Sequence, residues 1–119
     1  MPQRFAAGDN LVFQLESGFG IIRVLAVDGA GADTVWHVLA YEELFPDVEA
    51  AERALAQPRS LHIRKHHMAL TDRAFERTPA AKVGNRPVTD EELKLYGQWQ
   101  ESTEHHVSDR SVLLLLGMR

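Results

Sequence analysis

The sequence predicts an α+β domain in which a small, strongly bent antiparallel sheet, or a partly open barrel, carries two helices. Three strand-like apolar patterns follow one another in the first 41 residues, with short glycine-bearing segments between them. Helical spacing replaces this alternation after Pro46, and a Thr-x-x-Glu capping box at Thr89 opens a second helix. Because no linker or repeat divides the 119 residues, we expect a single domain over residues 1–119.

The first 41 residues are expected to form an antiparallel meander. Apolar side chains alternate along residues 11–15, which predicts a strand with one buried face. Residues 21–27 are rich in β-branched side chains and apolar on both faces, as in a central strand. Residues 34–41 supply the third strand. The connections contain glycine, which reaches positive φ without a Cβ clash and so suits tight turns.

The middle of the chain combines a helix, a strand and a helical turn. Pro46 suits the first turn of a helix, which Pro58 ends. Residues 60–70 begin with strict alternation, which is lost at residues 65–67, so the strand bends or ends there. The threonine at the start of residues 71–77 suits the cap of one helical turn.

The last third is expected to hold a loop, a helix and a closing strand. Residues 78–87 contain two prolines and a Gly-Asn pair, which are typical of a loop. The helix after the capping box carries Leu93, Tyr96 and Trp99 on one face. Residues 111–116 are apolar on both faces and are expected to form the fifth strand, buried in the sheet. At an edge this strand would need cover, so a homodimer in which a second copy covers it stays open.

Charge is unevenly distributed along the chain. The formal net charge is −4, from 13 basic and 17 acidic residues. Residues 1–57 hold three bases and nine acids, residues 58–86 hold seven and two, and residues 87–119 hold three and six. A basic middle between acidic ends either pairs internally in a compact fold or forms one basic patch that attracts acidic partners.

Several kinds of chemistry are excluded or disfavoured. The chain has no cysteine, which excludes disulfides, thiolate zinc sites, iron–sulfur clusters and cysteine nucleophiles. His62, His66 and His105 are candidate metal ligands, but the residues show no metal-binding spacing. No serine lies in a nucleophile elbow, and the glycine pairs lie between strands rather than before a helix. We therefore expect no catalytic residue, no metal, no cofactor and no enzyme activity.

Binding is the expected kind of function. An acidic patch suited to a basic protein partner, or simply to solvation of a helix face, comprises Glu42, Glu43, Asp47, Glu49 and Glu52. The alternative is a nucleic-acid-binding small barrel that uses the basic segment of residues 59–67. Its expected contacts are Arg59, Arg64 and Lys65, with Trp36 as a stacking surface. The sequence pI of about 5.8 disfavours this alternative, because acidic ends repel the phosphate backbone.

A family resemblance covers the N-terminal third. The Gly8-Asp9 turn, the strand of residues 11–15, the glycines Gly18 and Gly20, and Arg23-Val24-Leu25 resemble the opening of the immunity protein 26 family. Residues 61–70 also resemble this family, but less closely. The family consists of small bacterial proteins associated with polymorphic toxin systems. The resemblance implies a non-enzymatic, immunity-like protein that binds and blocks a partner toxin, here a basic toxin domain.

Nothing in the sequence points to a membrane. No apolar run approaches the roughly 20 residues that a spanning helix needs. The opening Met1-Pro2-Gln3-Arg4 is not followed by an apolar stretch, so no secretory signal is expected. We expect a cytoplasmic protein without a membrane partner.

Overall fold

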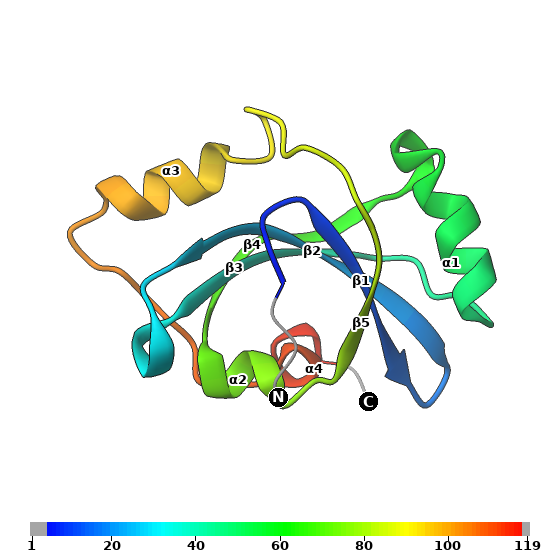
Figure 1. Ribbon diagram of the computed structural model, residues 1–119, viewed down its shortest axis with the longest axis horizontal. Coiled ribbons are helices and arrows are strands. Elements are labelled where there is room, and N and C mark those ends of the chain that lie inside the picture. Colours follow the sequence, from blue (N-terminus) through cyan, green and yellow to red (C-terminus); the bar gives the residue numbers. More distant parts are fainter. Residues whose placement is uncertain (1–4, 118–119) are drawn as a thin grey trace.

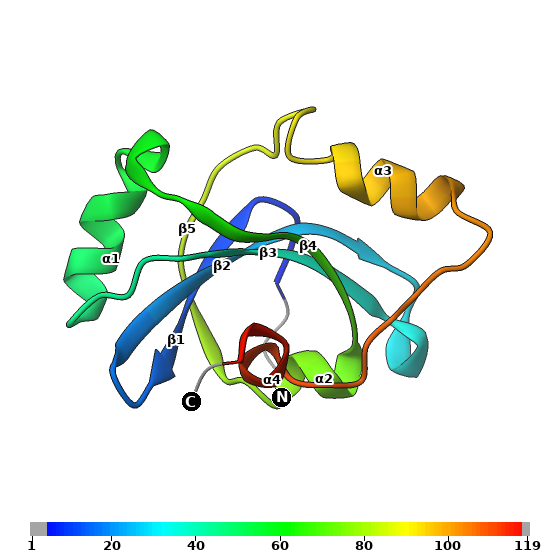
Figure 2. The same ribbon diagram turned by 180° about the vertical axis from the view of Figure 1, so that it is seen from behind.

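The computed structural model describes residues 5–117, so Met1–Arg4, on which part of the expected localisation rests, lie outside the described residues. A bent five-stranded antiparallel sheet carries helices on both faces (Figures 1 and 2). Its strands are β1 (Asp9–Leu15), β2 (Gly18–Asp28), β3 (Val35–Tyr41), β4 (Ile63–Thr71) and β5 (Ala80–Asn85). In the order β4-β3-β2-β1-β5, the outer strands lie at opposite edges, so the sheet is not closed into a barrel. The predicted α+β class is confirmed.

The helices divide between the two faces of the sheet. They are α1 (Val48–Leu55), α2 (Asp72–Glu76), α3 (Lys94–Glu101) and α4 (Val112–Leu116), with 3-10 turns η1 (Gly31–Asp33) and η2 (Pro58–Ser60). Figures 1 and 2 show α2 and α4 on the concave side of the sheet and α3 on the convex side. The two predicted helices correspond to α1 and α3, but α3 begins at Lys94, after a turn that holds the Thr89 capping box, and not at the box itself. Among the helices of residues 5–117, none has the length and apolarity needed to cross a bilayer.

The predicted meander forms β1, β2 and β3. β1 pairs antiparallel with β2, with Val12 opposite Ile21, and β2 pairs antiparallel with β3, with Val24 opposite Val38. β4 extends the meander on the far side of β3. The register between β3 and β4 shifts on either side of Ala40, opposite the residues at which alternation was expected to fail. The strand bends there and continues.

The position of the fifth strand was predicted wrongly. β5 lies within residues 78–87, which were expected to form a loop, and it pairs with β1. Residues 111–116 form α4 instead of a strand. The Ser111 side chain accepts a hydrogen bond from the Leu114 backbone N–H, and Gly117 ends the helix at a φ of 66°. The reason given for a homodimer was an apolar C-terminal strand that a second copy could cover. Within residues 5–117 there is no such strand, so this reason no longer applies.

Two apolar layers cover the two faces of the sheet. The concave layer seats α2 and α4 and consists of Leu11, Phe13, Leu15, Ile22, Val24, Trp36, Val38, Ala40, Met68, Leu70, Ala74, Phe75, Val112 and Leu116. The convex layer seats α1 and consists of Val12, Ile21, Leu25, Leu39, Tyr41, Ala51 and Leu61. Because side chains alternate along a strand, neighbouring residues lie in opposite layers. The convex layer has fewer apolar residues than the concave layer, and buried polar side chains also lie on that face.

Candidate binding site on the convex face

Arg23, in the middle of β2, is fully buried and holds the segment between β5 and α3 against the convex face. Its Nε donates to Glu92 Oε2 over 2.7 Å. Nη1 donates to the Gly8 carbonyl oxygen over 2.9 Å and to Asn10 Oδ1 over 3.0 Å. Nη2 donates to the carbonyl oxygens of residues 86 and 87, over 2.8 and 3.1 Å. Each guanidinium nitrogen thus has an acceptor, which offsets the cost of burying the charge.

The Glu92 carboxylate also closes the predicted capping box. Thr89 N donates to Glu92 Oε1 over 3.0 Å, and Glu92 N donates to Thr89 Oγ1 over 3.2 Å. Burial acts to raise the pKa of Glu92, but hydrogen bonds from Arg23 and Thr89 outweigh it, and the pKa lies below its ordinary value. Glu92 is therefore a charged anchor that fixes residues 86–93 over the sheet.

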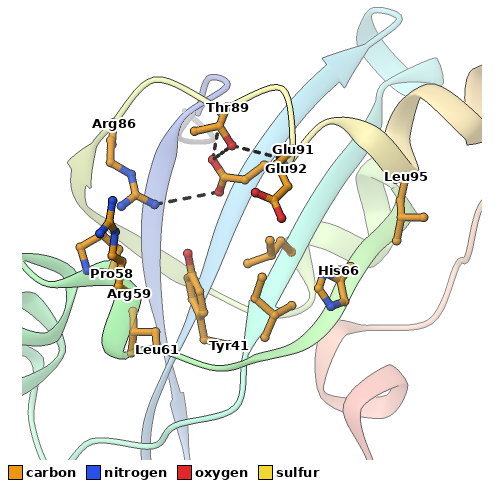
Figure 3. Close-up of a pocket in the computed structure, with 12 residues that line it drawn as sticks. Tyr41, Pro58, Arg59, Leu61, His66, Arg86, Thr89, Glu91, Glu92 and Leu95 are labelled. Atoms are coloured by element: carbon orange, nitrogen blue, oxygen red, sulfur yellow. Dashed lines mark hydrogen bonds and ion pairs between the residues drawn. The ribbon is translucent and has the colours of Figure 1, made fainter.

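A pocket of about 540 Å³ lies between this anchored segment, η2 and the start of α3 (Figure 3). Its floor is apolar and comes from Leu39 and Tyr41 of β3, Ile63 of β4 and Leu61, which follows η2. Its walls are formed by Pro58, Arg59, His66, Arg86, Thr89, Glu91, Glu92 and Leu95. Burial raises the pKa of the Tyr41 hydroxyl, which is therefore neutral at pH 7. The volume is typical of pockets that bind small molecules or projecting side chains.

One end of the pocket is cationic. Figure 3 shows Arg59 and Arg86 at that end, with Leu95 at the other. Arg86 Nη2 forms a long ion pair with Glu92 Oε2 at 4.0 Å, beyond hydrogen-bond distance (Figure 3). Arg86 Nε is a buried donor without a hydrogen-bond partner among residues 5–117. Because guanidinium groups bind carboxylates and phosphates well, this end is complementary to an anionic group.

A chain of hydrogen bonds lies beneath α3, on the same face of the sheet. His37 of β3 is fully buried, and its Nε2 lies 2.9 Å from Asp28 Oδ2. His37 Nδ1 lies 2.9 Å from His67 Nε2. Because a carboxylate only accepts, His37 Nε2 carries the proton, and His67 Nε2 then donates to His37 Nδ1. Tyr96 of α3 donates its hydroxyl proton to the same carboxylate, over 2.8 Å to Oδ1.

Aromatic rings of α3 cover these histidines. The centroid of the His37 ring lies 4.5 Å from that of Tyr96 and 4.6 Å from that of Trp99. Burial lowers the pKa of His37, although Asp28 opposes the shift. Burial and the neighbouring His37 lower the pKa of His67 to about 4. Both rings are therefore neutral at pH 7, and they position α3 through hydrogen bonds and ring packing.

The five acidic residues of the predicted patch have different roles in the structure. Asp47 Oδ1 accepts from the Ala50 backbone N–H over 2.7 Å and caps α1. Glu43 Oε1 accepts from the backbone N–H of His62 over 2.6 Å and lies 2.8 Å from Nδ1 of its ring. The remaining three are exposed and are Glu42, Glu49 and Glu52. Asp47 is exposed as well and Glu43 is half-buried, so four of the five acidic side chains lie on the surface.

The basic residues of the nucleic-acid alternative are exposed, but its stacking residue is not. The exposed residues, on η2 and on the edge strand β4, are Arg59, Arg64 and Lys65. Trp36 is only 2% exposed, so its expected role as a base-stacking surface is wrong. Its ring stacks on Phe75 at a centroid distance of 4.2 Å, and its Nε1 donates to Asp72 Oδ1 over 2.8 Å. Strand alternation places this side chain in the concave layer, where it seats α2.

The three candidate metal ligands have separate surroundings. His62 contacts Glu43, His66 lines the pocket, and the His105 ring stacks on Trp99 at a centroid distance of 4.6 Å. Within the described part of the chain, no group of three or more His, Asp or Glu side chains is arranged to hold a metal ion.

Sequence reasoning missed Arg23 and His37, the two residues around which the convex face is organised. Each is a polar side chain inside an apolar run, Ile21-Ile22-Arg23-Val24 and Val35-Trp36-His37-Val38. Such a position indicates a buried polar group with satisfied hydrogen bonds. The partners remained hidden because Glu92 is 69 residues from Arg23 and His67 is 30 residues from His37.

Comparisons with protein-family models, curated proteins and solved structures give no match. In the structure, the residues that carry the N-terminal resemblance support the fold. Gly8 has a φ of 92°, and a Cβ there would lie 2.6 Å from the Arg86 carbonyl oxygen, so only glycine fits. Arg23 is buried and donates to that same glycine. Gly8 and Arg23 therefore support the wall of the pocket from inside the fold and do not line the pocket.

Proposed function

We propose that this chain is a non-catalytic protein-interaction domain that receives a projecting part of a partner protein on the convex face of its sheet. The observation that carries the proposal is the pocket of about 540 Å³, with its apolar floor and charged walls. Three of the four floor residues, all except Leu61, lie on the paired strands β3 and β4. A pocket built on such strands is formed before the partner arrives, which limits the entropy lost on binding.

An exposed apolar side chain belongs to this surface. Leu95 lines the pocket and is 41% exposed. The centre of a protein interface is typically apolar and is surrounded by a polar rim. Leu95 is therefore the side chain best placed to contact a partner directly.

The exposed acidic residues favour a basic partner. Glu42 follows β3 directly, and Glu49 and Glu52 belong to α1. Charge complementarity of this kind raises the association rate and weakens as the salt concentration rises. We therefore assign these three residues to the rim that steers the partner towards the pocket.

The most specific form of the proposal is an immunity-like protein that binds and blocks a partner toxin. The resemblance of residues 8–25 to the immunity protein 26 family supports this form. Blocking requires only that the bound chain cover the functional surface of the toxin. The proposal therefore assigns no catalytic residue to this chain.

The proposal is tested by affinity purification from the organism that encodes the chain. The baits are the unmodified chain, Leu95→Glu and Leu114→Glu. Leu114 is a matched control because it is an exposed leucine, 68% accessible, on α4 at the concave side. We expect a protein that the unmodified chain and Leu114→Glu retain and that Leu95→Glu loses. If every retained protein binds the three baits equally, the convex face is not the binding surface.

Charge is tested on the complex so obtained. The double variant Glu49→Lys/Glu52→Lys should slow association of the purified partner at low salt by about tenfold or more, and the difference should shrink at high salt. An association rate that does not depend on these charges would show that the residues only solvate α1.

A further inference from the structure

We infer that the pocket binds the free carboxyl-terminal residue of a partner polypeptide, with the terminal carboxylate between Arg59 and Arg86 and an apolar side chain on the strand floor. This inference rests on the proposed function and names the part of the partner that enters. Three features of the pocket support the inference. They are its cationic end, its apolar floor and the Glu91 carboxylate on the wall between them.

The cationic end requires an acceptor. Arg86 Nε is buried and has no hydrogen-bond partner among residues 5–117, although most buried donors in proteins are satisfied. Arg59 is exposed at the same end of the pocket (Figure 3). Because Arg86 Nε itself is buried, a carboxylate placed there would pair with the Nη groups of Arg59 and Arg86. Such charge-assisted bonds are among the strongest that a protein offers to a ligand.

The charge balance of the walls also favours an anion at this end. Glu92 is engaged by Arg23 at 2.7 Å, so these two charges compensate each other. Arg86 also lies 4.0 Å from Glu92, and Arg59 and Glu91 complete the set, so the three arginines and two glutamates leave one positive charge in excess. Figure 3 shows Glu91 above the middle of the pocket, where it would repel a carboxylate that entered the other way round. The ligand therefore has a defined orientation.

The remainder of the pocket suits an apolar side chain. Leu39 and Ile63 lie on its floor and Leu95 on its wall. A terminal residue with a leucine-like side chain would cover these groups while its carboxylate reaches the arginines. A polypeptide end supplies both parts at once, and it projects from a folded partner, as a binding pocket of this depth requires.

The test uses acetyl-Ala-Ala-Leu with a free carboxylate, the same tripeptide as its carboxyl-terminal amide, and free leucine. Binding is followed by NMR on the isotope-labelled chain, with the Arg86 Nε–H signal as the specific readout. We expect the acid to shift this signal and to bind at least about tenfold more tightly than the amide. Arg59→Gln should weaken binding of the acid by about tenfold or more. Arg53→Gln, an exposed arginine of α1 outside the pocket, should leave it unchanged.

Three results would overturn the inference. Equal binding of acid and amide would show that the carboxylate is not recognised. Tighter binding of free leucine than of the acetylated tripeptide would identify a pocket for a free amino acid. An unchanged Arg86 signal at roughly 10 mM acid would show that the cationic end stays empty. If any of these occurs while Leu95→Glu still loses a partner, the protein-interaction proposal stands and only the assigned occupant is wrong.

Discussion

Arg23 Nε and Glu92 Oε2 lie 2.7 Å apart and join the centre of the sheet to the segment that precedes α3. The arginine is fully buried and the carboxylate is 14% exposed. The same guanidinium also donates hydrogen bonds to the carbonyl oxygens of residues 86 and 87, in the segment that forms a wall of the pocket. One buried side chain therefore fixes both the N-terminal turn and the wall of the candidate site.

The first prediction concerns this ion pair. Arg23→Met should lower the free energy of unfolding by about 3–5 kcal/mol, because Glu92 Oε2 and the carbonyl oxygens of residues 86 and 87 lose the donors that Arg23 supplies. Urea unfolding measures the change. Arg110→Gln, at an exposed position, is the control and should shift the free energy by less than about 0.5 kcal/mol. A loss below about 1 kcal/mol for Arg23→Met would mean that water replaces the arginine easily.

The second prediction concerns α4, where two leucines face opposite ways. Leu116 is 3% exposed and belongs to the concave layer, whereas Leu114 is 68% exposed. Leu116→Ala should cost about 2–5 kcal/mol of unfolding free energy through lost burial and a new cavity, and Leu114→Ala should stay within about 0.5 kcal/mol. Urea unfolding of the pair is the measurement. Similar costs for both variants would contradict the packing of α4 against the sheet.

The third prediction is a loss of stability in weak acid. The folded chain lowers the pKa of His67 to about 4, from an ordinary value of 6.5. As the pH falls from about 6.5 to about 4, the unfolded chain therefore binds more protons than the folded chain at this residue. The free energy of unfolding falls over that window, by about 3 kcal/mol at most, and His67 contributes no pH dependence above it.

His67→Gln isolates this effect. The glutamine amide can donate to His37 Nδ1, as His67 Nε2 does, but it does not titrate. Urea unfolding at about pH 7 and about pH 5 should therefore show a smaller difference for the variant than for the unmodified chain. His37, whose pKa is also lowered, supplies the remainder. Identical pH dependence in both proteins would contradict a neutral, half-buried His67.

The fourth prediction concerns the hydrogen bond between α3 and β2. Tyr96→Phe keeps the ring against His37 but removes the hydroxyl that donates to Asp28 over 2.8 Å. The cost should be about 1–2 kcal/mol, because the acceptor is charged. Burial and the bond to Asp28 raise the pKa of Tyr96 to about 12, and burial also raises that of Tyr41, so the absorbance change that this variant removes should be a late one. If the absorbance change lost in the variant instead falls near the ordinary tyrosine pKa of about 10, the contact is refuted.

The elements predicted correctly are those whose signal is local. Alternation and short glycine-bearing turns define β1 to β3, and the cap at Asp47 and the stop at Pro58 define α1. The register shift of β4 also lies where alternation fails. Each of these features depends on residues close together in the chain, so one sequence contains the information.

The elements predicted wrongly depend on distant partners. β5 has the weak sequence Ala80-Ala81-Lys82-Val83-Gly84-Asn85, and it becomes a strand because β1 offers an edge to pair with. Residues 112–116 are apolar throughout, a pattern that fits either a buried strand or a helix. Ser111 as the N-cap and Gly117 as the C-cap favour the helix, and these two residues are the local evidence that could have predicted it.

The candidate site was largely beyond sequence reasoning. The acidic residues were identified, but two of the five are used to cap α1 and to hold His62. The pocket combines η2, two strands and the segment before α3, and no short motif links these parts. Arg59 was identified for a different partner, nucleic acid, and the structure places it beside Arg86 instead (Figure 3).

The pairing of β5 with β1 sets an order for assembly during synthesis. Hairpins between successive strands close short loops, whereas β1 must wait for β5 across most of the chain, at a larger entropic cost. We expect amides of β1 to β3 to gain protection before those of β5 in pulsed hydrogen exchange, and simultaneous protection would contradict this order. A nascent chain would then leave the ribosome as a curved sheet first. It could bind its partner only after α3, which carries Leu95, has left the ribosome and packed against the sheet.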